Sequence, residues 1–256
     1  MKSIFVVLTL TLFVAAFSFA ADETDDTLIL YFSFDELDGE NTIDHSQYSN
    51  NGVINGTPEH VDGKFGKALK LNGTTDWVEV PHDPSLTVES GVTVMAWINA
   101  ERHMGPNNQR WQGILSKGNG PRSYSFYTES PSLCMHFSAG GGSTCSTELP
   151  LNEWIHVVAQ VDGEFHRYWL NGENIGEFGG KTPLPGAGDT SNVFVGTTAE
   201  GANRRFLGLI DEVRIWNRAL TEEEVIAEME VGFQSGTAVD PRDKLATTWG
   251  TIKYEQ

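Results

Sequence analysis

Basic residues are scarce in this chain. The 256 residues include 17 Lys and Arg against 35 Asp and Glu, which gives a formal charge of −18 at pH 7. This balance leaves no electrostatic basis for binding nucleic acid or an anionic membrane, because both would repel so acidic a surface. An acidic excess is typical of soluble extracellular surfaces and is compatible with binding a divalent cation.

Long hydrophobic runs are also few, and the longest begins at Ile4. Residues 1–20 contain Lys2, an apolar stretch over 4–17 and a terminal Ser18-Phe19-Ala20, whose small residues fit cleavage after Ala20. The run is short for a transmembrane span, and no second run of spanning length follows. An uncleaved anchor is the alternative, and the pattern favours cleavage. We therefore predict a signal peptide over 1–20 and export, to the medium or the cell envelope, without membrane insertion of the mature protein.

Cysteine is nearly absent. Cys134 and Cys145 are the only two, and a glycine-rich stretch over 139–143 separates them, as in a hairpin that brings them together. Two thiols are too few soft ligands for a metal site, and nothing nearby would activate either as a nucleophile. In an oxidising compartment we predict a disulfide between them.

Recognisable catalytic motifs are missing as well. The histidines are dispersed without HExxH spacing, and the sequence contains no GxSxG elbow and no phosphate-binding loop. These absences exclude a zinc protease of that type, an α/β-hydrolase and a P-loop enzyme.

The sequence is rich in alternating apolar residues, with a period of two rather than 3.6. Eleven such segments, rich in β-branched and aromatic residues, are separated by Gly, Asn, Asp and Pro, and several end in the Asn-Gly or Asp-Gly pairs that tight hairpin turns favour. We predict an all-β fold, a two-sheet antiparallel sandwich. The predicted strands cover 28–34, 68–73, 77–81, 92–99, 112–118, 124–129, 133–138, 154–163, 165–172, 192–198 and 206–217.

One helix is predicted, and it begins after the last strand. Thr221 and Glu224 have the spacing of a capping box, an acidic first turn follows Thr221, and Val225, Ile226 and Met229 form one apolar face. Gly232 then ends the run. We therefore predict a sandwich domain over 27–220, and a helix and tail over 221–256.

An ordered set of motifs resembles the LamG-like jelly-roll family of concanavalin A-like lectins and glucanases. It runs from GKFGKALKLNGTTDWVEVP through VTVMAWIN, ILSKG and WIHVVAQVDGEFHRYWLNGE to VFVGTT and LGLIDEVRIWNRALTEEEV. The resemblance covers roughly residues 27–228 and implies a jelly roll of two curved antiparallel sheets. Members often carry a disulfide where Cys134 and Cys145 lie. They serve as binding modules, adhesion modules or spacers, and some relatives are glycosidases.

A glycosidase would need two facing carboxylates. Glu36-Leu37-Asp38-Gly39-Glu40 resembles the E-x-D-x-E motif of the related β-glucanases, but Gly39 breaks strand character and no aromatic residue lies near it. An acidic loop is the favoured interpretation. We therefore assign no catalytic residue and predict that the protein is not an enzyme.

Four side chains predict a calcium site. Asp35 follows the first strand, Asp44 and Asn51 belong to a turn-rich loop that resembles the D-x-S-x-x-x-N-G loop of LamG-like relatives, and Asp211 lies in the closing strand. In this family the closing strand lies beside the first, which would bring these oxygen ligands together. The alternative is that Asp44 and Asn51 only satisfy turn backbone while Asp211 pairs with a nearby arginine.

Two polar loops contain the predicted ligand-binding residues. Trp111 ends the loop 101–111, where an aromatic has little reason to be buried, and the loop 199–206 has a similar composition. Sugar rings stack on exposed aromatics while amides and guanidinium groups donate to hydroxyls, and loops at one end of a sandwich commonly bind ligands. The predicted residues are Arg102, Asn108, Arg110, Trp111, Asn203 and Arg204.

The favoured function is thus a secreted, non-catalytic module that binds carbohydrate or an extracellular protein ligand, with calcium as a stabilising ion. A structural or adhesion spacer is the first alternative, and a glycoside hydrolase is the second.

Overall fold

The computed structural model describes residues 25–119, 122–138, 145, 147–179 and 188–233. The predicted signal peptide and the tail after residue 233 lie outside these ranges. Within them, no helix is long and apolar enough to cross a bilayer.

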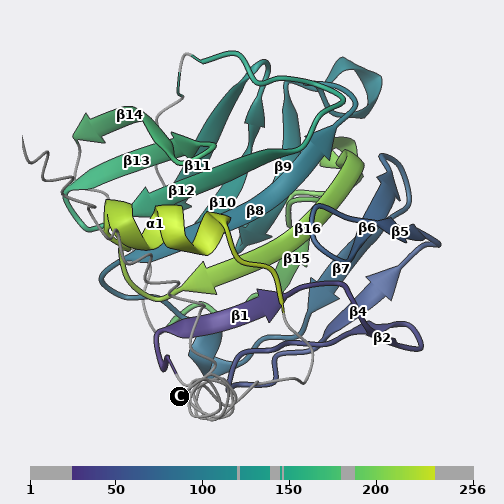
Figure 1. Cartoon of the computed structure of the whole chain (residues 1–256), viewed down its shortest axis with the longest axis horizontal. Coiled ribbons are helices and arrows are strands. Elements are labelled where there is room, and N and C mark those ends of the chain that lie inside the picture. The colour runs from purple at the N-terminus through teal and green to yellow at the C-terminus, as the bar shows by residue number, and fades with distance from the viewer. Residues whose placement is uncertain (1–24, 120–121, 139–144, 146, 180–187, 234–256) are drawn as a thin grey trace, which may run out of the picture.

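Sixteen strands and one α-helix, α1 (Glu222–Met229), account for most of the described residues (Figure 1). Short 3-10 turns occur at η1 (Pro84–Leu86), η2 (Pro106–Asn108) and η4 (Ala202–Arg204). The strands are β1 (Leu28–Phe32), β2 (Leu37–Asp38), β3 (Asn41–Thr42), β4 (Gly52–Asn55), β5 (Glu59–Asp62), β6 (Lys67–Asn72), β7 (Trp77–Val80), β8 (Val92–Ala100), β9 (Trp111–Lys117), β10 (Arg122–Glu129), β11 (Ser132–Ser138), β12 (Ile155–Val161), β13 (Phe165–Leu170), β14 (Glu173–Gly179), β15 (Val193–Val195) and β16 (Leu207–Trp216).

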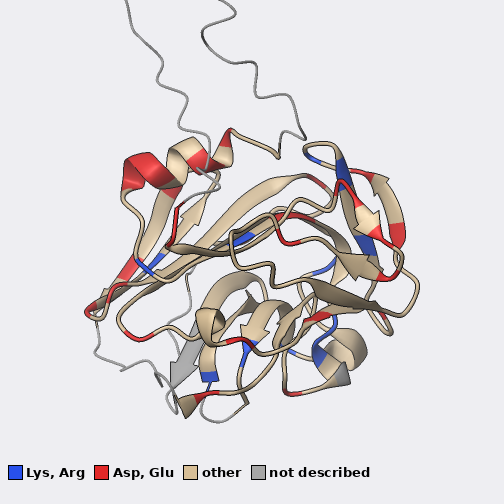
Figure 2. Ribbon diagram, turned by 90° about the horizontal axis from the view of Figure 1, so that it is seen from below, with Lys and Arg blue, Asp and Glu red and all other residues tan. Residues whose placement is uncertain are grey.

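The strands form two antiparallel sheets that pack face to face (Figure 2). Sheet A has the order β14-β13-β12-β8-β16-β6-β5, with β1 also paired to β16, and sheet B has the order β11-β10-β9-β15-β7-β4-β3-β2. The chain crosses between the sheets several times, so strands distant in sequence become neighbours. The predicted jelly-roll sandwich is therefore confirmed, including the pairing of the first strand with the closing strand.

The main core lies between the two sheets and follows from the alternation of side chains along each strand. In β8, Val94, Ala96 and Ile98 belong to this core, whereas Met95 belongs to a second cluster on the outer face of sheet A. A fully buried aliphatic side chain contributes about 1.5–3 kcal/mol. The inter-sheet core therefore supplies most of the apolar stabilisation of the sandwich.

Helix α1 covers the second cluster, on the outer face of sheet A (Figures 1 and 2). Its N-terminus has the predicted capping box: the Glu224 N–H donates to Thr221 Oγ1 (3.3 Å), and the Thr221 N–H donates to Glu224 Oε2 (2.7 Å). Val225 of the helix packs with Trp169 and Trp216 of the sheet. The helix therefore completes a second apolar layer.

A buried ionic network holds the end of α1 against sheet A. Arg214 donates from Nη2 to Glu212 Oε2 (2.6 Å) and to the Tyr31 hydroxyl (2.8 Å), and from Nη1 to the Glu228 carbonyl (3.0 Å). The Phe233 N–H donates to Glu212 Oε1 (3.2 Å). Arg214 and Glu212 are 1% exposed, so this network forms part of the interior and links β1, β16 and the chain after α1.

The predicted disulfide is not formed. Successive side chains of a strand point to opposite faces, and Leu133 of β11 lies in the inter-sheet core, which places Cys134 on the outer face. The N–H of Cys145 donates to Leu133 O (2.9 Å), its side chain belongs to the inter-sheet core, and its Sγ donates to Ile175 O (3.4 Å). The two buried cysteines thus lie on opposite sides of sheet B and are not joined.

Candidate functional site

Asp211, a predicted calcium ligand, accepts backbone hydrogen bonds instead of pairing with an arginine. Its Oδ2 accepts from the N–H groups of Lys64 (2.8 Å) and Phe65 (3.1 Å), and its Oδ1 accepts from the Glu212 N–H (2.8 Å). Burial, with a smaller effect from the neighbouring Glu212 carboxylate, raises the pKa of Asp211 to about 8. The side chain thus holds the turn over 63–67 against sheet A.

Asp35 holds the same turn from its other end. Its Oδ1 accepts from the Lys67 N–H at 2.6 Å. A Cβ on Gly66, which has φ +40°, would lie 1.7 Å from that oxygen, and a Cβ on Gly63 would lie 2.6 Å from Asp211 Oδ2. The two glycines are therefore required for the two carboxylates to approach the turn this closely.

Asp44 organises a different loop. Its Oδ1 accepts from the N–H groups of Tyr31 (2.8 Å) and Ser46 (2.9 Å), and its Oδ2 accepts from the Asn50 N–H (2.7 Å). Asn51 Oδ1 accepts from the Asp44 N–H at 2.9 Å. These are the hydrogen bonds of a structured turn, which is the alternative that the sequence left open.

The four predicted ligands therefore serve two separate turns, Asp35 and Asp211 in one, Asp44 and Asn51 in the other. In the part of the chain that the structure describes, no three His, Cys, Asp or Glu side chains are grouped as a metal site would require. The single calcium site predicted from the sequence does not fit this arrangement. Calcium binding by this chain stays a prediction that would require these side chains to rearrange.

Thermal unfolding in EDTA and in excess CaCl₂ tests the prediction of calcium binding: with the side chains arranged as they are, their oxygens engaged by backbone donors, the midpoint is the same in both. An ion bound only to the folded state at hundredfold excess over its Kd would stabilise it by about 2.7 kcal/mol. Differential scanning calorimetry, with MgCl₂ at equal ionic strength as the control, measures this. A calcium-specific rise of that size would show that the ligands do rearrange around the ion.

The E-x-D-x-E segment lies on an exposed hairpin. Glu36, Asp38 and Glu40 are all exposed, next to or within β2 and β3 at the edge of sheet B. A pair of catalytic carboxylates would need to face each other across a substrate cleft. The position of this segment therefore agrees with an acidic loop.

The two predicted binding loops, 101–111 and 199–206, meet at one end of the sandwich. A Cβ on Gly105 would lie 2.4 Å from the carbonyl oxygen of Trp111 and 2.7 Å from that of Asn203. Gly105 also donates its N–H to Gln109 O (2.9 Å), which closes the first loop on itself. The backbones of the two loops therefore approach closely, which their similar composition did not by itself predict.

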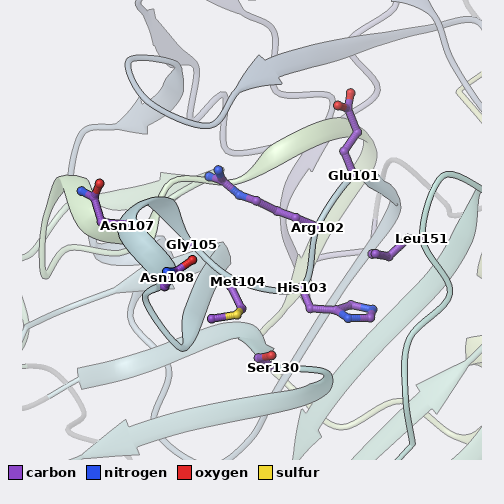
Figure 3. Close-up of a pocket in the computed structure, with 9 residues that line it drawn as sticks. All are labelled: Glu101, Arg102, His103, Met104, Gly105, Asn107, Asn108, Ser130 and Leu151. Atoms are coloured by element: carbon purple, nitrogen blue, oxygen red, sulfur yellow. The ribbon is translucent and has the colours of Figure 1, made fainter.

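An open pocket of about 420 Å³ lies beside this contact (Figure 3). His103, Met104 and Leu151 provide its less polar side, and Arg102 extends away from His103 and Leu151 (Figure 3). A hydrogen bond between His103 Nε2 and Leu149 O, at 2.7 Å, fixes the ring of His103. The residues that line the pocket are Glu101, Arg102, His103, Met104, Gly105, Asn107, Asn108, Ser130 and Leu151.

The predicted arginines of the first loop have different roles. Arg102 Nη2 donates to the carbonyl oxygens of Gly73 (3.1 Å) and Arg205 (3.2 Å) and thereby holds three segments together. Arg110, whose side chain is 64% exposed, pairs with Glu129 at 2.6 Å. Of the two, Arg110 is the one that a ligand in solvent could reach.

Trp111 lies partly buried at the start of β9, with one side of its indole covered by the Arg204 guanidinium, 4.6 Å from the ring centroid. Its Nε1 has no hydrogen-bond partner among the described residues. Asn203, next to Arg204, is exposed. Trp111, Asn203 and Arg204 therefore come together, with Trp111 more buried than the sequence led us to expect, whereas Asn108 lies at the pocket.

Sequence reasoning missed Arg122 and Glu200. Glu200 pairs with Arg122 through Oε1 and with Arg204 through Oε2. Arg122 and Glu200 are separated by 78 positions in sequence and come together because the loop 199–206 contacts sheet B, where Ala199 N–H donates to Ser116 Oγ (2.9 Å). The loop composition around Glu200 was the only available signal for this pair.

Residues 72–226 match the family model of the concanavalin A-like lectin/glucanases superfamily. The chain belongs to this superfamily. The matched stretch begins at the end of β6 and includes both binding loops, the closing strand and most of α1. This assignment agrees with the jelly-roll topology of the two sheets.

Solved structures of other proteins have a similar fold at low sequence identity. Domain 4 of AbnA, an extracellular arabinanase from Geobacillus stearothermophilus solved in complex with arabinotriose, is 21% identical, with a TM-score of 0.59 over 80% of this chain and 98% of that one. A structure of botulinum neurotoxin type C, whose cell entry depends on interaction with two ganglioside molecules, is 13% identical, with a TM-score of 0.62 over 80% of this chain and 51% of that one.

A curated human protein, pappalysin-1, is 27% identical over 105 residues. The matching stretch is 40% of this chain but only 6% of pappalysin-1. This similarity therefore concerns a small part of that protein.

Proposed function

We propose that this concanavalin A-like chain is an exported, non-catalytic module that binds carbohydrate at the end of the sandwich formed by loops 101–111 and 199–206. The observation that carries the proposal is the meeting of these loops beside an open pocket, with an indole, exposed amides and arginines on one surface. Aromatic rings and polar donors are the groups that bind the apolar faces and the hydroxyls of sugars.

The fold comparisons support a carbohydrate ligand, because the arabinanase domain was solved with arabinotriose and cell entry of the neurotoxin depends on gangliosides. The alternatives are an extracellular protein ligand, a structural or adhesion spacer, and a glycosidase. A spacer would need no pocket, and a glycosidase would need paired carboxylates in a cleft, so the surface around Trp111 favours the binding module.

Replacing Trp111 by Ala is expected to weaken binding of a glycan identified on an array of immobilised oligosaccharides by about tenfold or more, equivalent to about 1.4 kcal/mol. The substitution removes the ring on which a sugar would stack. Isothermal titration calorimetry with the soluble oligosaccharide measures the loss.

Tyr48→Ala is the matched control, since Tyr48 is an aromatic residue 37% exposed on a different loop. Its affinity should equal that of the unaltered protein, and thermal unfolding checks that both variants fold. Equal binding by the Trp111 variant would place the ligand elsewhere. Reducing sugar released from the bound oligosaccharide would instead identify a glycosidase.

A further inference from the structure

Arginines are concentrated around the proposed binding surface. Five of the nine arginines in the sequence lie in its two loops or at the start of β10. They are Arg102, Arg110, Arg122, Arg204 and Arg205. In a chain with a formal charge of −18, this concentration of guanidinium groups requires an explanation beyond solubility.

Two of these arginines hold a single carboxylate. Glu200 lies between Arg122 and Arg204 and pairs with one guanidinium through each of its oxygens. The side chains of all three are partly accessible, with exposures of 15–21%. A guanidinium binds a carboxylate strongly because its planar donors match the carboxylate oxygens. The site is thus shaped to bind a carboxylate, and a residue of its own loop occupies it.

Further buried donors in the same loops and strands have no partner within the described part of the chain. Trp111 Nε1, Arg122 Nε and Thr198 Oγ1 are buried atoms with no hydrogen-bond partner among the described residues. Buried polar atoms of this kind are rare in folded proteins unless a ligand or water pairs with them. Arg204, one of the two arginines that hold Glu200, lies 4.6 Å from the centroid of the Trp111 ring, so the carboxylate site and the aromatic ring adjoin through this guanidinium.

We propose that this surface binds an acidic sugar, whose carboxylate displaces Glu200 from Arg122 and Arg204 while its ring lies near Trp111. The proposal rests on the carbohydrate-binding function proposed above and specifies its ligand as a uronic or sialic acid. Glu200 then acts as an internal competitor that occupies the arginine pair until a ligand carboxylate replaces it.

The probes are trigalacturonic acid, trimannuronic acid and 3′-sialyllactose, each measured by calorimetry beside its methyl ester, which keeps the sugar and removes the charge. At least one acid should bind, and its ester should bind at least tenfold more weakly. Glu200→Gln should raise affinity for that acid several-fold, because the internal competitor loses its charge. Arg204→Gln should lower it at least tenfold.

Glu177→Gln is the matched control for charge. Glu177 also pairs with an arginine, Arg167, but on β14 of sheet A, so its neutralisation changes the net charge equally without touching the site. It should leave affinity for the acid unchanged, and thermal unfolding should show that each variant is folded.

Equal binding of acid and ester, or weaker acid binding by Glu200→Gln, would overturn the acidic-ligand inference and leave the carbohydrate-binding function intact. Failure of both the acids and an array of neutral glycans to bind would overturn the proposed function, and with it the inference.

Discussion

Replacing Arg214 by Met is expected to lower the free energy of unfolding by about 3–5 kcal/mol, because removal of one partner leaves a buried charge without compensation. Glu212 would lose its 2.6 Å bond to the guanidinium, and the carbonyl of Glu228 would lose its 3.0 Å donor. Tyr31 would also lose the cation 4.2 Å above its ring. Urea denaturation monitored by tryptophan fluorescence measures the change.

The matched control is Arg167→Met. Arg167 also contacts two carboxylates, those of Asp162 and Glu177, but its side chain is 23% exposed and that of Glu177 is 48% exposed. Ion pairs in contact with water contribute about 0–1 kcal/mol, so this variant should lose little stability. Adding Glu212→Gln to Arg214→Met should recover part of the loss by removing the orphaned charge. A loss below 1 kcal/mol for Arg214→Met would show that the network contributes little to the fold.

The parts of the fold that the sequence predicted best are the strands buried on one or both faces. β8, β12 and β16 are nearly continuous runs of buried residues, and their apolar content marks them clearly. β5 and β14 lie at the edges of sheet A with mostly exposed or half-buried side chains. A strand without a buried face has no alternation of apolar and polar residues, and the sequence therefore did not reveal these edge strands.

The closing strand shows why the role of Asp211 could not be predicted. Its segment has the composition of one regular strand, but the register shifts between Asp211 and Arg214, and Glu212 adopts φ +51°. Such a bulge inserts one extra residue and re-aims its neighbours. The carboxylates of Asp211 and Glu212 consequently bind different partners, the turn over 63–67 and the Arg214 network, and neither pairing is encoded in local spacing.

The candidate binding surface was predictable where one loop carried its own signal. An indole among amides identified the loop that ends at Trp111, and composition identified the loop containing Asn203 and Arg204. The pairing of Glu200 with Arg122 depends on tertiary structure alone, because a charged residue in a polar loop has the same composition whether it is solvated or held by two cations.

The Arg214 network and the proposed binding surface lie on different parts of this sandwich. The Arg214 network and α1 cover the outer face of sheet A, whereas Trp111 and Arg122 belong to strands of sheet B. Substitutions more than about 10 Å apart without shared partners are usually additive. Variants of the network should therefore change unfolding without changing glycan affinity, and the effects of a network variant and a Trp111 variant on unfolding should add.

Stability is expected to fall with rising pH through the titration of Asp211. Burial raises the pKa of this carboxyl from its ordinary value of 3.8 to about 8 in the folded state. Because the folded state holds the proton more tightly than the unfolded state, the proton on Asp211 stabilises the fold fully below about pH 4. This contribution is lost as pH rises from about 4 to about 8. Between pH 5.5 and 8.5 the contribution of this proton to the free energy of unfolding falls by about 3 kcal/mol, because each pKa unit corresponds to about 1.4 kcal/mol.

The measurement is the free energy of unfolding of the unaltered protein minus that of Asp211→Asn, at several pH values in this range. Asn cannot ionise, so the difference should become less favourable to the unaltered protein by about 3 kcal/mol as pH rises. Other groups, such as His156, whose pKa burial lowers to about 3, titrate in both proteins and cancel.

Asp62→Asn is the control, because Lys67 holds the pKa of this exposed carboxyl below its usual range. Its difference curve should stay flat above pH 5.5. A flat curve for Asp211→Asn as well would mean that the three backbone N–H donors keep Asp211 ionised in spite of its burial.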